Sequence, residues 1–115
     1  MLAKHLRFHG YGSLRYIYKN ADAARSRLFI VKAISNPRRS SSRFAVVVSK
    51  KVHKGAIGRN RIRRRIYEVL RHELPHLNGI YDIAIIVTSG ETLAVEHTEL
   101  TASLHELLRQ SKVIS

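Results

Sequence analysis

The residues of this chain best suited to chemistry are the arginines of residues 58–66, which read Gly-Arg-Asn-Arg-Ile-Arg-Arg-Arg-Ile. A guanidinium group binds phosphate through paired, charge-assisted hydrogen bonds, and it also stacks on bases. No acidic residue accompanies these arginines, because residues 23–67 hold 14 Lys or Arg and no Asp or Glu. Such a stretch repels itself unless an anion lies beside it. The pattern therefore predicts a surface for a polyphosphate, with nucleic acid as the leading candidate.

The positive charge is concentrated in one part of the chain. The first 67 residues hold 18 basic residues and one acidic residue, whereas the remaining 48 hold three basic and seven acidic, within a net charge of +13. An anionic membrane would favour a helix with Trp, Phe or Leu opposite the charge, but the best candidate helix has Ile, Val and Leu at core spacing. Solubility alone does not require so long a stretch without acids. Nucleic acid remains the favoured partner, and no membrane partner is expected.

The sequence offers little that could catalyse a reaction by itself. It contains no cysteine, and its seven histidines form no paired metal motif. His72 and His76 have i, i+4 spacing, but Pro75 lies between them and breaks the helix that would align them. Carboxylates are too sparse near the arginines for a two-metal nuclease. We therefore expect no catalytic residue and no bound metal in the protein.

Length and hydropathy predict a single domain over residues 1–115. The longest apolar run, residues 83–87, is far too short to span a membrane, and the N-terminus lacks the apolar core of a secretory signal. The absence of cysteine is compatible with a reducing compartment. We expect a soluble protein that is cytoplasmic in a bacterium.

Hydrophobic periodicity predicts six elements. Helical spacing is expected for residues 12–20, with Ser13 as the N-cap, and β-forming residues predict strands at 28–34 and 44–49 that would pair as a hairpin. A helix over 59–72, a strand over 80–87 and a helix over 96–110 follow. The order is α-β-β-α-β-α, or αβββαβα if residues 44–55 hold two strands. Either order predicts an α+β two-layer sandwich.

The helix predicted at 59–72 would bury an apolar stripe and expose its arginines. Cations in its first two turns oppose the helix dipole, which costs a few tenths of a kcal/mol each when they are exposed. A phosphate placed there would meet free backbone N–H groups and guanidinium groups together. The alternative is a solvated basic face. The apolar stripe consists of Ile62, Ile66, Val69 and Leu70.

Residues 49–66, SKKVHKGAIGRNRIRRRI, resemble the signature of the bacterial ribonuclease P protein subunit. That signature ends a strand with V-S/A-K-K and continues as A-x-x-R-N-x-h-K/R-R-x-h, where h is apolar. The similarity extends to Arg7, Leu14 and Tyr18 near the N-terminus and to the last strand and helix, so it covers nearly the whole chain. The signature is matched at Val48, Lys50, Lys51, Ala56, Arg59, Asn60, Ile62, Arg63, Arg64 and Ile66.

Three positions depart from the family pattern. Leu14 replaces an aromatic residue, Tyr67 stands where a basic residue is usual, and Thr88 follows the last strand where Lys or Arg is usual.

The resemblance implies an αβββαβα fold in which the arginine-rich helix sits in a left-handed β-α-β crossover, whereas most such crossovers are right-handed. It also implies a protein subunit of the ribonuclease P endoribonuclease. The protein would bind the catalytic RNA and the 5′ leader of precursor tRNA, and would assist endonucleolytic removal of that leader. Catalysis and the required Mg²⁺ would belong mainly to the RNA. A monomeric protein in a 1:1 ribonucleoprotein is expected.

Eight residues are predicted to contact the catalytic RNA. Asn60 has two equal readings, RNA contact or helix N-cap. Lys50 and Lys51 follow a strand and are predicted phosphate contacts, with a solvated strand edge as the alternative. The full set is Lys50, Lys51, Arg59, Asn60, Arg61, Arg63, Arg64 and Arg65.

A second set is predicted to bind the leader. Unpaired bases stack on aromatic rings with little sequence preference, which suits a leader that varies between precursors. Tyr18 is the best candidate, Arg15 and Lys19 would hold phosphates beside it, and the alternative for every aromatic, Tyr11 included, is a place in the core. For Leu14 and Phe29 both readings stay open. The set is Leu14, Arg15, Tyr16, Tyr18, Lys19, Phe29 and Val31.

Two other classes of function compete with this one. A ribosomal or assembly protein shares the size and charge, and only the ordered motif separates it from the subunit of an RNA enzyme. A self-sufficient protein nuclease is disfavoured by the lack of a carboxylate cluster.

Overall fold

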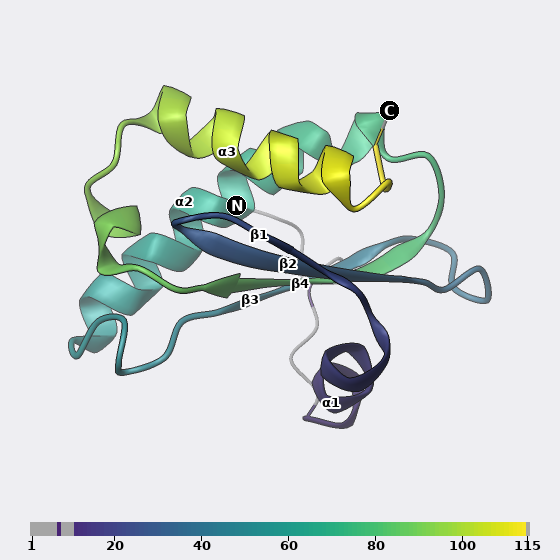
Figure 1. Ribbon diagram of the computed structural model, residues 1–115, viewed down its shortest axis with the longest axis horizontal. Coiled ribbons are helices and arrows are strands. Elements are labelled where there is room, and N and C mark those ends of the chain that lie inside the picture. Colours follow the sequence, from purple (N-terminus) through teal and green to yellow (C-terminus); the bar gives the residue numbers. More distant parts are fainter. Residues whose placement is uncertain (1–6, 8–10, 115) are drawn as a thin grey trace.

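The computed structural model describes Arg7 and residues 11–114, and the side chains of residues 11–13 lie outside that description. The secondary-structure order is αβββαβα, as the resemblance predicts, with two short 3₁₀ turns added (Figure 1). The elements are α1 (Tyr11–Asn20), β1 (Ala23–Arg25), β2 (Phe29–Ser35), β3 (Arg43–Val47), α2 (Ala56–Glu73), η2 (Leu74–His76), β4 (Tyr81–Val87), η3 (Gly90–Leu93) and α3 (His97–Gln110).

The four strands form one sheet in the order β1-β2-β4-β3. β2 runs antiparallel to both β1 and β4, whereas β3 runs parallel to β4. β4 is a central strand, and its run Ile83, Ala84 and Ile85 is buried on both faces of the sheet. A continuous apolar run is typical of a strand covered on both sides.

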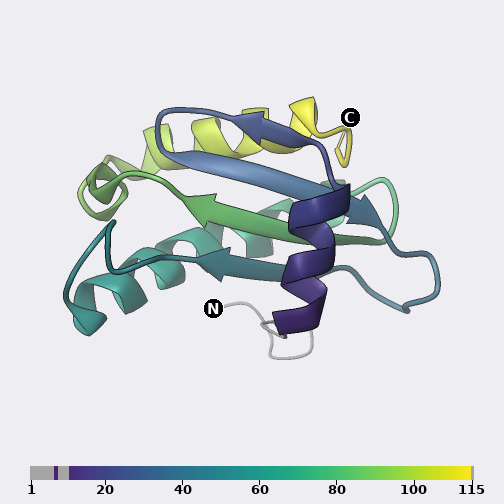
Figure 2. The ribbon, with the colours of Figure 1, turned by 60° about the horizontal axis from the view of Figure 1, so that its bottom comes forward.

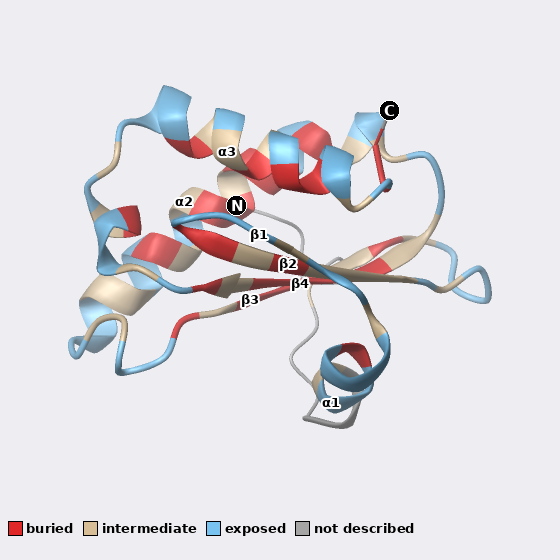
Figure 3. Ribbon diagram, viewed as in Figure 1, coloured by how far each residue is buried: buried red, intermediate tan, exposed pale blue. Residues whose placement is uncertain are grey.

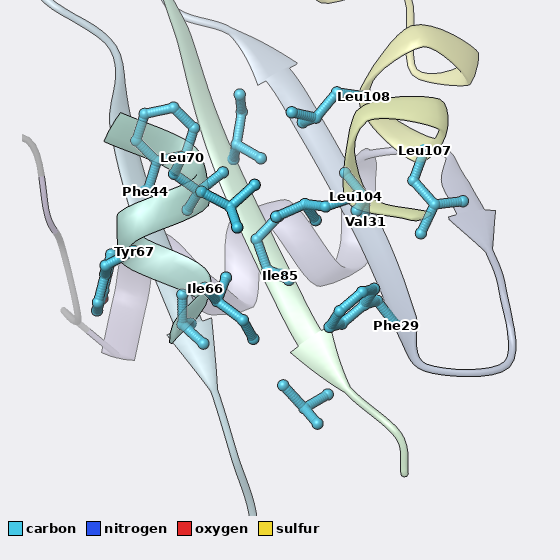
Figure 4. Close-up of a cluster of buried hydrophobic side chains, with 14 of the residues drawn as sticks. Phe29, Val31, Phe44, Ile66, Tyr67, Leu70, Ile85, Leu104, Leu107 and Leu108 are labelled. Carbon is cyan, nitrogen blue, oxygen red and sulfur yellow. The ribbon is translucent and has the colours of Figure 1, made fainter. Parts of the chain in front are cut away.

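Helices cover both faces of this sheet. α2 and α3 lie together over one face, and α1 crosses the other (Figures 1 and 2). Their buried surfaces face the strands (Figure 3). The main core fills the space between the sheet and α2 and α3 (Figure 4), and its largest fully buried side chains include Phe29, Phe44, Ile62, Ile66, Leu70, Ile83, Ile85, Leu100 and Leu104.

A smaller cluster fixes α1 on the opposite face. Ile17 is 1% exposed and packs against Ala45 of β3 and Ala84 of β4. The two alanines carry no side chain beyond Cβ, so the helix can lie close to the strands. Among the described residues, α1 covers only part of this face (Figure 2).

The β3-α2-β4 connection is a crossover between parallel, neighbouring strands. In Figure 2 α1 faces the viewer, β3 and β4 both point left with β4 above β3, and α2 returns behind the sheet. This arrangement is left-handed, in agreement with the resemblance and against the common rule.

Two expectations about the strands were wrong. The third strand is Ala23–Arg25 and does not lie within residues 44–55, and the strands predicted to pair as a hairpin are separated by β4. β1 pairs with β2 through a tight turn, in which the Ser26 hydroxyl accepts hydrogen bonds from the backbone N–H groups of Leu28 and Phe29, each at 3.3 Å. Such a short strand shows no alternation from which it could be predicted.

Two predicted helix starts were also wrong. α2 begins at Ala56 after an extended Gly55, so Asn60 lies inside the helix and is not its N-cap. α1 begins at Tyr11, which places Ser13 inside that helix as well. Glycine disfavours helix interiors by about 1 kcal/mol, and Gly58 therefore argued against an early start of α2. The arginines consequently follow the first turn of α2 and do not surround its free N–H groups.

Candidate nucleic-acid interface

The start of α2 is held by the loop that precedes it. The Arg59 guanidinium donates through Nη1 to the carbonyl oxygens of His53, at 3.0 Å, and Lys54, at 2.7 Å. The His53 ring lies over Gly58, where an added Cβ would come within 2.2 Å of the ring. Glycine at position 58 therefore allows the loop to pack against the helix. The Arg59 guanidinium is used in holding the loop in that position.

Arg65 ties the other side of α2 to the segment after β4. Its guanidinium donates to three backbone carbonyls, those of Thr92, at 2.7 Å, Leu93, at 3.0 Å, and Val95. Thr92 is fully buried and donates through its hydroxyl to the Ser89 carbonyl at 2.8 Å, which makes the acceptor segment rigid. The contacts of Arg65 thus connect α2 to the segment after β4 and stabilise the fold.

The remaining polar residues of the motif point away from these anchors. Arg61 and Arg64 are exposed, and Arg63 is half-buried. Asn60 is exposed and accepts a hydrogen bond through Oδ1 from Arg63 Nη1 at 2.8 Å, which orients the guanidinium group. Asn60 and Arg64 lie opposite the buried residues Ile62, Ile66 and Val69 of α2, and Arg61 and Arg63 flank them on either side.

Three of them line a groove at the edge of the sheet. This β3-edge groove has a volume of about 630 Å³ and lies between α2, the outer strand β3 and the N-terminal part of the chain. Its polar groups come from Asn60, Arg63 and Arg64, and its apolar wall comes from the strand. The other lining residues are Arg7, Leu14, Ala45, Val46, Val47, Val48 and Tyr67.

Arg7 places a guanidinium group next to Tyr67 of α2. Its Cζ atom lies 5.7 Å from the centroid of the Tyr67 ring, within the range of a cation–π contact. Burial raises the pKa of the Tyr67 phenol, which stays neutral. Arg7 also forms a bridge to Phe44 at the outer edge of β3, and within the described part of the chain its buried Nε has no hydrogen-bond partner. Arg7 therefore places a cation beside Tyr67 in the β3-edge groove.

Most ion pairs of the described carboxylates are with basic residues outside the motif. Asp82 pairs with Arg43, Glu68 with Arg71, Glu106 with Arg109, and Glu73 with His76 and His105. Arg27 pairs with both Glu91 and Glu99. Arg61, Arg63 and Arg64 form no ion pair with a carboxylate of the described residues, so their charge remains available to an anion.

The predicted leader residues divide into two groups. Tyr18 lies on α1 beside β2, where Lys32 donates through Nζ to the Tyr18 carbonyl at 2.8 Å and sits 5.8 Å from the centroid of its ring. Tyr18 is 40% exposed, and Arg15, Tyr16 and Lys19 are exposed as well. Leu14 is half-buried, and the side chain of Tyr11 lies outside the described residues.

The leader prediction for Val31 was wrong, and of the two readings left open for Phe29 the core reading is correct. Both side chains are 0% exposed and belong to the main core beneath α2 and α3, on the sheet face opposite α1. Successive strand residues point to opposite faces, so Ile30 and Lys32 occupy the face that Phe29 and Val31 were expected to share with Tyr18.

Sequence reasoning missed the residues of the α1 side of the sheet. Ile30 pairs with Ile86, and the row continues to Arg25 on β1 and Val47 on β3. With Lys32 this row forms the open sheet face, which is apolar at its centre and cationic at its edge. The alternation of Ile30 and Lys32 with buried Phe29 and Val31 was the signal that could have identified them.

Lys50 and Lys51 are exposed in the turn between β3 and α2, on the approach to the arginine helix. No group of three His, Cys, Asp or Glu side chains that could hold a metal ion occurs among the residues that the structure describes. None of the described helices is long and apolar enough to cross a membrane.

Solved structures define the class of this fold. The Staphylococcus aureus RNase P protein superposes with a TM-score of 0.84 at 26% sequence identity, over 96% of this chain and 98% of that one. The Thermotoga maritima RNase P protein has the same fold, with a TM-score of 0.80 at 22% identity, over 90% of this chain and 96% of that one. The fold is that of the bacterial ribonuclease P proteins.

The sequence comparisons identify the family. The model of the Ribonuclease P family matches residues 2–112. The ribonuclease P protein component of Synechocystis is 27% identical over 98% of this chain and 90% of that protein, and that of Chloroflexus aurantiacus is 35% identical over 72% of this chain and 61% of that protein. The chain belongs to the ribonuclease P protein family. It is therefore a protein component of a tRNA-processing ribonucleoprotein, and the ribosomal alternative is excluded.

Proposed function

We propose that this protein binds the catalytic RNA of ribonuclease P through α2 and the β3-edge groove, and the 5′ leader of precursor tRNA through α1 and the open sheet face. The RNA cleaves the phosphodiester bond, with Mg²⁺ that it binds mainly itself. The protein acts as one copy per RNA in the bacterial cytoplasm. It contributes no catalytic residue.

One observation carries the assignment of the RNA surface. Arg63 and Arg64 line the β3-edge groove, Arg61 is exposed on the neighbouring part of α2, and none of the three forms an ion pair with a carboxylate of the described residues. Paired guanidinium groups fit phosphate oxygens, and Asn60 orients one of them. Lys50 and Lys51 extend the same cationic surface.

The leader assignment is supported by the open sheet face beside Tyr18. Ile30, Val47 and Ile86 offer a flat apolar surface for bases, and Arg25 and Lys32 stand at its edge. A surface of this kind accepts many sequences, since every base has a face that can stack.

Reconstitution tests the proposal. The purified protein is mixed with a bacterial ribonuclease P RNA at low Mg²⁺, and precursor tRNA processing is compared with that of the RNA alone and of the protein alone. We expect cleavage only when both are present. Cleavage by the protein alone, or no gain over the RNA alone, would contradict the proposal.

A double substitution locates the RNA surface. Arg63→Ala with Arg64→Ala should weaken binding to the ribonuclease P RNA while leaving the fold intact, because both side chains lie outside the core. Each phosphate contact that is lost should lower the slope of log affinity against log salt by about 0.7–0.9. Unchanged affinity at physiological salt would remove these two residues from the interface.

A further inference from the structure

A second cavity lies on the other side of α1. This α1–loop pocket has a volume of about 520 Å³ and is formed by α1, the end of β2 and the loop that follows it. Among the described residues it shares no lining residue with the β3-edge groove. The pocket is lined by Tyr16, Ile17, Ile34, Ser35, Asn36, Pro37, Arg38, Arg43 and Asp82.

One wall of the pocket is an exposed aromatic ring. Tyr16 is 59% exposed, the highest value for a tyrosine whose side chain the structure describes. Tyr16 and Tyr18 both line a shallow hollow on the outside of α1, but only Tyr16 also lines the α1–loop pocket. An exposed ring beside a cavity is available for stacking, whereas the Tyr18 ring already lies near Lys32.

The floor of the pocket is polar and fixed. Arg43 donates to the Asp82 carboxylate through Nε and Nη2, both at 2.9 Å, and Asn36 donates to the same carboxylate at 2.8 Å. Burial alone would raise the pKa of Asp82, but the hydrogen bonds from Arg43 and Asn36 outweigh it and lower the pKa. The floor therefore presents polar atoms held in place, in an ion pair without net charge.

The rim of the pocket is cationic. Arg38 and Arg39 are exposed in the loop of residues 36–42, which contains no acidic residue. Arg38 lines the cavity, whereas Arg39 does not. The pocket thus combines an aromatic wall, a polar floor and a positive rim, which match the base face, the base edge and the phosphate of one nucleotide.

We propose that the α1–loop pocket binds one unpaired RNA nucleotide, with its base stacked on Tyr16 and its phosphate held by Arg38. The inference rests on the proposed function, because it assumes an RNA strand next to α1. The volume lies within the range of ligand sites. Such a nucleotide belongs either to the leader, as it continues past α1, or to the catalytic RNA.

Binding measurements with two probes distinguish these sources. The first probe is ribonuclease P RNA bound to the protein alone. The second is precursor tRNA, with a series of leaders of increasing length and with mature tRNA as the reference, bound to the reconstituted holoenzyme. Tyr16→Ala should lose about 5- to 100-fold in affinity on one of the two probes, the range expected for one stacked base. Loss on the first probe assigns the nucleotide to the catalytic RNA, and loss that requires a long leader assigns it to the leader.

Matched variants distinguish binding in the α1–loop pocket from non-specific electrostatic attraction of RNA. Tyr16→Phe keeps the ring and should bind as wild type does. Arg38→Ala should lose affinity on the same probe as Tyr16→Ala and lower its salt slope by about 0.7, whereas Arg39→Ala, with the same change of charge in the same loop, should retain wild-type affinity on both probes. Circular dichroism confirms that each variant is folded, as expected for exposed side chains.

Two outcomes overturn the proposal. One is wild-type affinity of Tyr16→Ala and Arg38→Ala on both probes, and the other is an equal loss for Arg39→Ala and Arg38→Ala. In either case wild-type protein would still support processing at low Mg²⁺. A failure of the wild-type protein to do so would instead contradict the proposed function.

Discussion

Arg64 and Arg65 are neighbours in the sequence, and their substitution by alanine is expected to have opposite consequences. Arg65→Ala removes the group that donates to the carbonyls of Thr92, Leu93 and Val95. Arg64→Ala removes an exposed side chain that lines the β3-edge groove. The first change should lower the free energy of unfolding, and the second should lower RNA affinity.

The cost of Arg65→Ala follows from the three hydrogen bonds. A hydrogen bond to a charged group contributes roughly 1.5–3 kcal/mol, but Arg65 is only half-buried and water can replace part of what is lost. We therefore expect a loss of about 2–4 kcal/mol, out of a total stability of about 5–15 kcal/mol for a domain. With a urea m-value of about 1–3 kcal/mol/M, the unfolding midpoint should fall by about 0.7–4 M. Arg64→Ala should stay within about 0.5 kcal/mol of wild type.

Two assays on the same variants check this difference. Urea unfolding followed by circular dichroism gives the free energy of unfolding, and titration with ribonuclease P RNA at several salt concentrations gives the affinity and its salt slope. Arg64→Ala should reduce the slope by about 0.7–0.9, the contribution of one phosphate, whereas folded Arg65→Ala should keep the wild-type slope. Arg65→Lys should recover little stability, because one ammonium group cannot reproduce a planar fork that reaches three carbonyls.

Two results would refute this reasoning. If Arg65→Ala unfolds at the wild-type urea concentration, the contacts with the segment after β4 do not stabilise the fold. If Arg65→Ala has the stability of wild type and loses the same salt slope as Arg64→Ala, Arg65 contacts RNA as the sequence predicted.

Two further predictions concern α1 and the pair at the end of the sheet. Tyr18→Ala should lower holoenzyme affinity for leader-bearing precursor tRNA by about 5- to 100-fold and leave mature tRNA binding unchanged; an equal loss on both would contradict a leader contact by Tyr18. Asp82→Asn should destabilise the protein by about 3 kcal/mol at neutral pH, because it leaves half-buried Arg43 without its carboxylate. The lowered pKa of Asp82 means that its stabilisation holds above the unfolded pKa of about 3.9 and is lost as the pH falls through the folded pKa. The stability difference between wild type and Asp82→Asn, measured by urea unfolding from pH 7 to pH 3, should therefore shrink on acidification, and a constant difference would contradict the assignment.

The elements that were predictable are those whose periodicity is local. Ile62 and Ile66 are fully buried as the helical spacing predicted, and the apolar run of residues 83–87 belongs to a central strand. β1 was not predictable, because three residues of Ala-Ala-Arg carry no alternation. The placement of β4 between β2 and β3 depends on pairing between segments far apart in the chain, which local patterns do not encode.

The candidate site was predictable as a set of residues but not as a division of roles. Arg59 and Arg65 belong to the same run as Arg61 and Arg64, and composition treats them alike. Their roles differ because each arginine has a different position on the helix, and only some positions face backbone carbonyl groups. The carbonyl groups that Arg65 binds lie about 30 residues further along the chain. Val31 was misplaced for a related reason, since its face of the strand is fixed by α2 and α3.

The acceptors that hold Arg59 and Arg65 also preserve the charge of the surface. Both guanidinium groups are satisfied by backbone carbonyls, which are dipoles without net charge, so the anchors fix α2 without neutralising it. Carboxylates in the same places would hold the helix equally well but would cancel charges next to Arg61 and Arg64. Glu99, Glu68 and Glu106 instead pair with Arg27, Arg71 and Arg109. An interface that depends on releasing counterions from RNA gains from every cation that remains unpaired, and anchoring by carbonyls satisfies that requirement while it keeps the helix in place.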